Sequence, residues 1–463
     1  MKYLLIPLCL ILSFLSCRPY LKELTKEVQS SRVYRIFPSN QTSTGDPEAG
    51  LAYLIHGDYI GGGIPVSTYQ DFMLPEPDTI LGRSGTNARI PYSSNAYHAF
   101  NGAEVVSGNC FTCHASPLED KMFLGLGNSS ASYQKNFKLQ MQIFKRIVKK
   151  KVGKDSPEWE AFETYADINL IALPNIITPN PGVNPAFRLE EAYVSQRNPV
   201  DLRFSKAAAF QMSPYVPASD VPPLWNVRKK HALYYNGMGR GAFTKLLMQA
   251  SSQGIQDSSE ARKVHDHFDD VLAWIQTLEA PDWPRETHMD LVAKGRILFK
   301  DECSRCHGTY GDRETYPNKL VPLHEVQTDP VYARYFLQAS GLADWYNQSW
   351  YATSPPTSTL TPSEGYIAPP LDGVWATAPY LHNGSVPTLE ALLNSKIRPT
   401  YWQKSDNTYD YQAIGWKYLE RNHGKDKQTY DCTEAGFGNQ GHYFGDNFSQ
   451  EERLAVLEYL KTL

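Results

Sequence analysis

Two short cysteine–histidine motifs constrain this chain more than any other feature of its sequence. The first is Cys110-Phe-Thr-Cys113-His114 and the second is Cys303-Ser-Arg-Cys306-His307. A C-x-x-C pair followed directly by histidine is the attachment pattern of c-type haem. The two thiols add across the vinyl groups of the macrocycle, and the histidine supplies the proximal nitrogen to the iron. The duplicated motif therefore predicts two covalently bound haem c groups.

Three other chemistries also use paired cysteines. Four thiolates can hold a structural zinc ion, one C-x-x-C can form a thioredoxin-type redox centre, and an exported chain can carry structural disulfides. A zinc site leaves the histidine after both pairs unexplained, and the βαβ context of a thioredoxin motif is missing. We therefore favour haem attachment. A further thiol, Cys432, receives no role from the sequence.

The N-terminal residues predict export. Lys2 precedes an apolar run from Leu4 to Leu15, which is typical of a signal peptide and too short to span a membrane. The segment Phe14-Leu-Ser-Cys17 is similar to the bacterial lipobox, whose cysteine becomes lipidated. We expect residues 1–16 to be the signal peptide. Cys17 would then anchor a periplasmic or cell-envelope protein to a membrane. The alternative is a secreted protein without lipid.

Composition narrows the classes of partner. The 45 Lys and Arg residues are balanced by 49 Asp and Glu residues, which gives a formal charge of −4. This balance provides no basic footprint for nucleic acid. A hydrophobic content of 41% excludes general disorder, and 32 prolines with 31 glycines favour long connections between short elements. We expect a redox partner protein or a small-molecule oxidant or substrate instead.

An internal repeat indicates two domains. Residues 271–278 and 456–463 share a Val-Leu…aromatic…Thr-Leu pattern with helical spacing, and each follows one of the two motifs. We expect an N-terminal extension over residues 17–95, a first cytochrome c domain over 96–280 and a second over 281–463. The predicted fold is mainly α, with two cytochrome c-type haem domains, long irregular insertions and a few short strands.

The chain resembles a known superfamily most clearly at residues 366–389, which read Tyr-Ile-Ala-Pro-Pro-Leu-Asp-Gly-Val-Trp-Ala-Thr-Ala-Pro-Tyr-Leu-His-Asn-Gly-Ser-Val-Pro-Thr-Leu. This segment is similar to the second-domain signature of bacterial di-haem cytochrome c peroxidases. The Gly-Thr-Tyr-Gly311 and Gly441-His-Tyr-Phe-Gly445 segments are most similar to the rubber-oxygenase branch. The resemblance implies one open, reactive haem and one six-coordinate haem that relays electrons.

The same resemblance implies roles for particular residues. His442 matches the position of the second axial ligand in the rubber-oxygenase branch, opposite His307. The methionine that other peroxidases use is missing, because residues 395–397 read Ser-Lys-Ile. Family members also bind a calcium ion through backbone oxygens, here those of Thr377 and Pro379, so calcium is a further candidate cofactor.

The first haem is the predicted reactive centre. No histidine occurs between His114 and His231, and Met122 fits a packing residue better than an iron ligand. A distal acid would help peroxide chemistry by moving a proton. The segment Asn198-Pro-Val-Asp-Leu202 resembles the one that carries this acid in the peroxidases, which makes Asp201 a candidate. The alternatives are a solvated loop aspartate and an apolar pocket.

Other residues are candidates for supporting roles. Trp225 could relay electrons between the haems, or it could be a core tryptophan. The run Arg228-Lys-Lys230 could pair with haem propionates, or it could face solvent. His382 is expected to contact a haem without ligating the iron.

We therefore expect an oxidoreductase that activates peroxide or dioxygen at the first haem and relays electrons through the second. The alternative is a non-catalytic periplasmic electron-transfer cytochrome c with two low-spin haems. The sequence leaves the substrate open among peroxide, a thiol, a polyisoprene and a partner protein.

Overall fold

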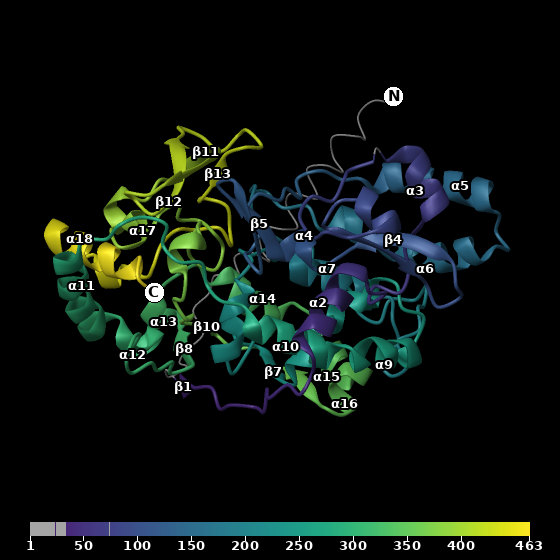
Figure 1. Ribbon diagram of the computed structural model, residues 1–463, viewed down its shortest axis with the longest axis horizontal. Helices are drawn as coiled ribbons and strands as arrows, with labels where there is room; N and C mark the ends of the chain where they lie inside the picture. Colours follow the sequence, from purple (N-terminus) through teal and green to yellow (C-terminus); the bar gives the residue numbers. More distant parts are fainter. Residues whose placement is uncertain (1–23, 25–33, 74) are drawn as a thin grey trace, which may run out of the picture.

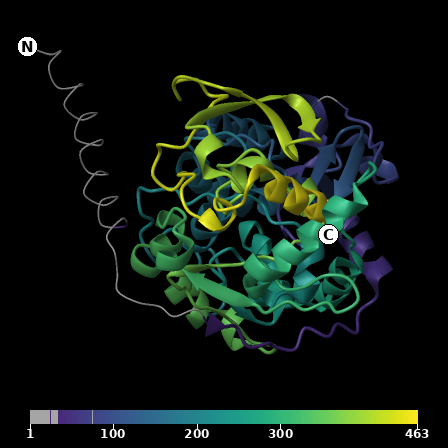
Figure 2. The same cartoon turned by 90° about the vertical axis from the view of Figure 1, so that its left-hand side faces the viewer.

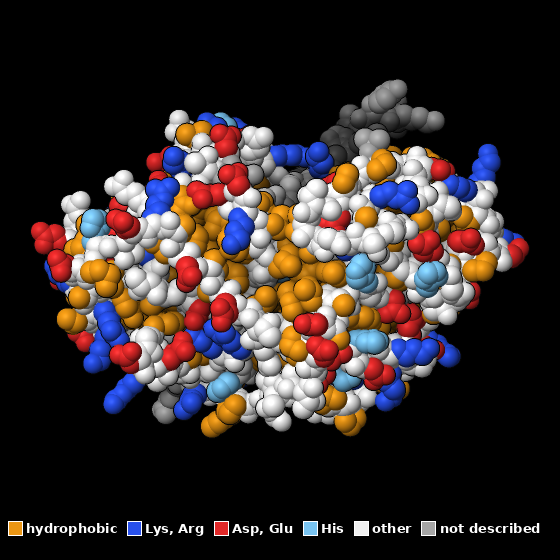
Figure 3. Space-filling model, in the orientation of Figure 1, with side chains coloured by type: hydrophobic (Ala, Val, Ile, Leu, Met, Phe, Trp, Pro, Cys, Tyr) orange, Lys and Arg blue, Asp and Glu red, His pale blue; other side chains and the backbone are white. Residues whose placement is uncertain are grey.

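The computed structural model describes residue 24 and residues 34–73 and 75–463 of the chain. The predicted signal peptide and the lipobox cysteine Cys17 lie outside these residues. The described chain forms two lobes that lie side by side (Figure 1). Apolar side chains gather in the middle of the visible face, where the lobes meet (Figure 3). No helix among the described residues is long and apolar enough to cross a membrane.

The first lobe contains helices of one to five turns and two small antiparallel sheets, β2-β4-β3 and β5-β6. Its helices are α2 (Pro47–His56), α3 (Val66–Phe72), α4 (Phe111–His114), α5 (Lys138–Val152), α6 (Pro157–Asn175), α7 (Ala186–Val194), α8 (Phe243–Leu247), α9 (Ser258–Asp266) and α10 (Phe268–Thr277). Its strands are β2 (Ile64–Pro65), β3 (Ser94–His98), β4 (Glu104–Gly108), β5 (Ala115–Leu118), β6 (Lys121–Leu124) and β7 (Gly239–Gly241).

The rest of the chain adds shorter helices and a three-stranded sheet in the order β12-β11-β13. The helices are α11 (Met289–Glu302), α12 (Ser304–His307), α13 (Leu323–Val326), α14 (Val331–Gln338), α15 (Leu342–Gln348), α16 (Trp350–Thr353), α17 (Leu389–Leu392) and α18 (Gln450–Leu460). The strands are β8 (Lys319–Pro322), β9 (Ser358–Leu360), β10 (Gly365–Ile367), β11 (Tyr401–Asp410), β12 (Gly415–Glu420) and β13 (Tyr430–Asp431). Figure 2 shows this lobe end-on, with α18 in front and the β11–β12 hairpin above it.

The two repeated helices, α10 and α18, are stabilised in different ways. Ser449 caps α18, and its side chain and that of Glu452 form a capping box. Helix α10 has no side-chain cap, but Phe268, Val271, Leu272 and Ile275 recur at helical spacing on its buried face. The start of α18 is thus marked by local sequence, whereas α10 depends on the packing of its apolar face.

Each repeated helix is crossed closely by one other helix, and a glycine lies at each crossing. A Cβ atom on Gly50 of α2 would lie 2.0 Å from the carbonyl oxygen of Asp270 on α10. A Cβ atom on Gly295 of α11 would lie 1.9 Å from the carbonyl oxygen of Ala455 on α18. The division into domains stays a prediction, but α2, which precedes residue 96, packs on α10 as α11 packs on α18.

Segments far apart in sequence are joined by short strand pairs. Strand β1 (Tyr34–Arg35) pairs with β8, which also pairs with β10, and β7 pairs with β9. Helices α14, α15 and α16 follow the second motif, yet their side chains belong to the same buried apolar cluster as α10. The insertion after the second motif therefore packs against the first lobe.

The fold is more mixed than the predicted mainly-α fold, with about 40% helix and 14% strand. The cause lies in the long insertions. The segment after Pro399 forms the β11–β12 hairpin, which contains the aromatic and β-branched residues Tyr401, Trp402, Thr408, Tyr409, Trp416 and Tyr418 that favour strands. The helices are thus concentrated around the motifs, and the insertions supply the strands.

We expect Gly295→Ala to destabilise the protein. Alanine is a better helix former than glycine by about 1 kcal/mol, so an uncrowded site would be stabilised. At Gly295 the new methyl group would strike the α18 backbone, and overpacking of this kind costs about 1–3 kcal/mol. Chemical denaturation measures the difference. Lys294→Ala, at the exposed neighbouring position, is the control. A more stable Gly295→Ala protein would contradict the close crossing.

Candidate haem-binding sites

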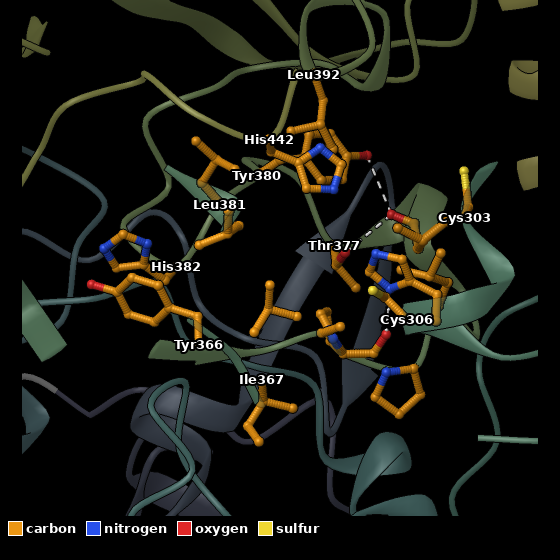
Figure 4. Close-up of a pocket in the computed structure, with 18 of the residues that line it drawn as sticks. Cys303, Cys306, Tyr366, Ile367, Thr377, Tyr380, Leu381, His382, Leu392 and His442 are labelled. Atoms are coloured by element: carbon orange, nitrogen blue, oxygen red, sulfur yellow. Dashed lines mark hydrogen bonds between the residues drawn. The ribbon is translucent and has the colours of Figure 1, made fainter. Parts of the chain in front are cut away.

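The second motif forms a single helical turn at the end of α11. The amide groups of Cys306 and His307 both donate hydrogen bonds to the carbonyl oxygen of Cys303, at 3.1 and 3.0 Å. The turn places both thiols and the imidazole against one cavity (Figure 4). The cysteines form no disulfide. The motif is therefore arranged to present two free thiols and one histidine to the same ligand.

The cavity is mainly apolar. Its volume is about 210 Å³, and part of it is open to solvent. Its walls come from α11 and α12, from residues 366–382, from α17 and from His442. An apolar cavity with a few convergent polar groups is typical of a cofactor site.

His442 faces His307 across this cavity. The centroids of the two imidazole rings are 6.2 Å apart. A metal–imidazole bond is about 2 Å long, as in zinc sites. Two such bonds, with each ring centre about 1 Å beyond its nitrogen, separate the centroids by about 6 Å. The two rings are thus spaced to ligate one iron from opposite sides.

The protonation of both rings suits ligation. Nδ1 of His307 lies 2.8 Å from the carbonyl oxygen of Pro369, which fixes the proton there and leaves Nε2 for a metal. Burial lowers the pKa of His307, and it lowers the pKa of His442 to about 3. Since only neutral imidazole binds a metal, both residues are held in the ligating form.

The first motif is anchored in the other lobe. The amide of Cys110 donates to the Tyr59 hydroxyl at 3.0 Å, and the side-chain amide of Asn184 lies 3.0 Å from the Cys113 sulfur. His114 is half-buried, and its Nδ1 atom is buried without a hydrogen-bond partner among the described residues. Burial, with a smaller contribution from the positive charge of Lys230, lowers the pKa of His114 to about 4.

The surroundings of His114 differ from those of His307. No second imidazole of the described chain makes a ring contact with His114, whereas His442 faces His307. Tyr133 and Tyr193 instead lie near Cys113, whose charge contributes to their raised pKa values. The two motifs therefore occupy unlike environments, one with a histidine pair and one with a single histidine.

Glu190 is a residue that sequence analysis missed. It lies on α7 one turn before Tyr193, and side chains three apart share a helix face. Its Oε1 atom is buried and has no hydrogen-bond partner among the described residues. Burial, with the nearby charge of Glu191, raises the pKa of Glu190 to about 8. An acidic pair on a helix is usually assigned to solvent, so only the packing of α7 reveals its position.

The other candidate acid, Asp201, lies in a loop. Its carboxylate accepts a hydrogen bond from the amide of Arg203 at 3.0 Å, which is a local turn contact. A distal role for Asp201 stays a prediction. Met122 lies on β6 and packs against the main apolar cluster.

A short 3-10 helix, η2 (Leu224–Lys229), joins the two sites. The amide of Gly125 donates to the carbonyl of His114, and the amide of Leu224 donates to the carbonyl of Gly125, both at 2.8 Å. The next residue, Trp225, is only 2% exposed. Its indole N–H donates to the carbonyl oxygen of Asp372 at 2.8 Å.

The following residue completes the connection. The side-chain amide of Asn226 donates to the carbonyl oxygen of Pro370 at 3.1 Å. The neighbouring carbonyl, that of Pro369, is the one held by His307. Trp225 thus lies within a hydrogen-bonded route from the backbone of His114 to the imidazole of His307.

The predicted basic run divides into three environments. Arg228 is exposed. Lys229 is paired with Glu314 and with Asp372. Lys230 lines the second cavity and also acts on His114, and burial lowers its pKa to about 8. Only Lys230 is placed near both sites.

His382 lines the second cavity, stacked on Tyr366 (Figure 4). The ring centroids are 4.1 Å apart and the planes are inclined by 19°. Its Nε2 atom is buried without a hydrogen-bond partner among the described residues. A buried polar atom of this kind generally has a partner, and a group bound in the cavity would supply one.

The predicted calcium site uses backbone oxygens, so the arrangement of acidic side chains does not test it. Among the described residues, no group of three or more His, Cys, Asp or Glu side chains is placed to hold a metal ion. The predicted calcium ligands are backbone oxygens, and Thr377 and Pro379 both line the second cavity.

Comparison with known proteins agrees with this geometry. Residues 365–403 match a family model described as RoxA-like, cytochrome c-like. This match links the chain to the cytochrome c family, and with it to covalently bound haem c and to a haem-based oxidoreductase or electron-transfer role. The matched residues include the wall of the second cavity that carries Pro369 and His382.

The chain is also similar to two curated proteins that carry the name uncharacterized protein. Protein y4iM of Sinorhizobium fredii (strain NBRC 101917 / NGR234) is 28% identical over 237 residues, which cover 46% of this chain and 52% of the relative. Protein y4iJ of the same strain is 26% identical over 254 residues, covering 40% of this chain and 41% of the relative. The chain thus spans about half the length of these relatives or less.

We expect His442→Gly to convert one haem from low spin to high spin and to leave the other unchanged. Glycine tolerates the left-handed backbone at this position, where φ is 50°, so the loop should persist. Electron paramagnetic resonance and optical spectra measure the spin state. His324→Gly, at a histidine outside the cavity lining, is the control. An unchanged spectrum in His442→Gly would mean that another residue is the ligand.

Proposed function

We propose that this protein is an exported di-haem c-type oxidoreductase that activates peroxide or dioxygen at the first motif and relays electrons through the second. The observation that carries the proposal is the asymmetry of the two sites. His307 faces His442 at a spacing that suits six-coordinate iron, whereas His114 faces no second histidine of the described chain. A haem iron with an open axial position supplies the redox chemistry that such oxidants require.

The roles of the chain's own residues follow from this asymmetry. The four motif cysteines would attach the two haem groups, and His114 and His307 would each supply a nitrogen ligand to an iron. His442 would supply the further ligand that keeps small molecules from the second iron. His382 and Lys230, which line the second cavity, would donate hydrogen bonds to the propionates of the group bound there.

Trp225 is the proposed electron relay. Its indole is buried in the contact between the lobes, and it belongs to the helix that binds the backbone on both sides of the route. A large π-system at this place shortens the gap between two redox groups. The residue also has a packing role, because it lies in the apolar cluster of the second lobe.

Glu190 is the proposed proton donor and acceptor of the first site. A carboxylic acid aids peroxide cleavage when it can move a proton between the two oxygens. The raised pKa of Glu190 keeps it mostly protonated at neutral pH. It lies on α7 one turn before Tyr193, the tyrosine on which the charge of Cys113 acts, and its own charge acts on Tyr234 and Tyr332. Asp201, the candidate from sequence, is held by a local turn.

Export and anchoring complete the proposal. Bacteria attach haem c outside the cytoplasm, which agrees with the expected signal peptide, and Cys17 would hold the protein at a membrane. The proposal also includes a calcium ion bound by the backbone oxygens of Thr377 and Pro379. It further includes a redox partner protein. The substrate class proposed here is a small oxidant, either peroxide or dioxygen.

Carbon monoxide binding tests the proposal directly. We expect the reduced protein to bind carbon monoxide at one of its two haems, because one iron is open. His114→Ala should abolish this binding, whereas His307→Ala should retain it at the first haem and slow re-reduction. Intact mass first establishes that two haem masses are attached. If both haems are low-spin and neither binds carbon monoxide, the result would instead support a non-catalytic electron-transfer cytochrome c.

We expect Glu190→Gln to slow the reaction with hydrogen peroxide by about 10²- to 10⁴-fold. In the wild type the rate should fall as pH rises through about 8, since the side chain loses its proton there. The variant should lose this pH dependence. Stopped-flow optical spectra measure both effects. Asp201→Asn is the matched control, and a larger loss in that variant would move the role to Asp201.

A further inference from the structure

One arginine, Arg398, holds the loop that carries His442. The guanidinium lies between α17 and the 439–442 segment, and it is half-buried. Its donors reach five backbone carbonyl oxygens, which belong to Ala391 at 3.0 Å, Leu392 at 2.8 Å, Asn439 at 2.6 Å, Gly441 at 2.7 Å and His442 at 3.3 Å. Arginine has five N–H donors in a rigid fork, so its whole capacity is used here.

The loop needs such a restraint. His442 has a φ of 50°, in the left-handed region that non-glycine residues rarely adopt. Elsewhere in the described chain, the amide of His442 donates to the carbonyl oxygen of Val326 at 2.7 Å, and the side-chain amide of Asn439 donates to the carbonyl oxygen of Pro399 at 2.8 Å. Strained backbone of this kind persists only where the surroundings fix it. Arg398 supplies three of the contacts that do so.

Arg398 also connects the ligand to the wall of its own cavity. The carbonyls of Ala391 and Leu392 belong to α17, and Leu389, Leu392 and Leu393 line the second cavity. The same side chain therefore fixes the distance between the His442 loop and the apolar wall. A shift of the loop would move the imidazole away from His307.

The guanidinium brings a positive charge close to His442. This charge lowers the pKa of His442 further, after the effects of burial and of His307. Asp446, whose carboxylate accepts hydrogen bonds from the amide and hydroxyl of Ser395, is an acidic group that acts on Arg398 and also, in the opposite direction to Arg398 and more weakly, on His442. A nearby positive charge disfavours the oxidised, more positive form of an iron centre.

We propose that Arg398 is the positioning residue of the second haem: it keeps His442 on the iron through geometry and raises the reduction potential through charge. This inference rests on the proposed function, in which His307 and His442 are the axial pair. It assigns the residue no contact with substrate.

Two substitutions separate geometry from charge in the full-length holoprotein. Arg398→Lys keeps the charge but loses the fork, and loss of charged hydrogen bonds should weaken His442 ligation about tenfold or more. It should therefore give a partly high-spin second haem with a nearly unchanged potential in the low-spin fraction. Arg398→Gln should show the same spin change and also a more negative midpoint potential.

Arg453→Lys is the matched control. Arg453 also binds backbone carbonyls beside α17, those of Leu393 at 3.0 Å and Phe448 at 2.9 Å, but the described structure gives it no bond to residues 439–442. The control should keep the wild-type spin state and potential. Haem content and thermal unfolding are measured for every variant, so that a general loss of stability is recognised.

The outcomes of the two proposals are distinguishable. If His442→Gly gives a high-spin haem while both Arg398 variants keep the wild-type spectrum and potential, the role of Arg398 is overturned and the axial pair stands. If His442→Gly leaves the spectrum unchanged, the axial pair itself is wrong. A high-spin change in Arg453→Lys equal to that in Arg398→Lys would show a general packing effect and would also overturn the inference.

Discussion

The second lobe depends on the spacing between two buried imidazole rings. A centroid separation of 6.2 Å suits one metal between His307 and His442, and neither ring can move far without losing that fit. Each ring is held from a different part of the chain, His307 by Pro369 and His442 by a strained loop. Burial keeps both rings neutral, which ligation requires. The cavity walls, α17 and the loop contacts are arranged around this distance.

A different constraint is the burial of polar atoms that have no protein partner. Among the described residues, Nδ1 of His114 in the first motif and Oε1 of Glu190 on α7 are two such atoms. Leaving buried polar atoms unpaired is costly, so such atoms indicate a bound group or a functional use. Because η2 is bonded to the backbone on both sides, the two sites are mechanically joined through Trp225.

Several parts of this arrangement could be predicted from sequence because they depend on local chemistry. The haem motifs need only five consecutive residues each. The helix α18 is marked by its capping box, whereas its close crossing with α11 at Gly295 became visible only in the structure. Packing of Met122 in the apolar core also agrees with its sequence reading. The small sheets were underestimated, since their strands pair residues as distant as β1 and β8.

The sequence by itself determined the cofactor chemistry, because two thiols and a histidine must be neighbours in the chain to attach haem c. Tertiary structure decided which other groups share each site. The pairing of His442 with His307 was suggested by resemblance, but only packing sets their distance. The burial of Glu190 is likewise set by packing and was not predicted from sequence. Asp201, which was predicted from a motif, lies in a loop turn. Burial and orientation depend on contacts between distant segments, and no local pattern encodes them.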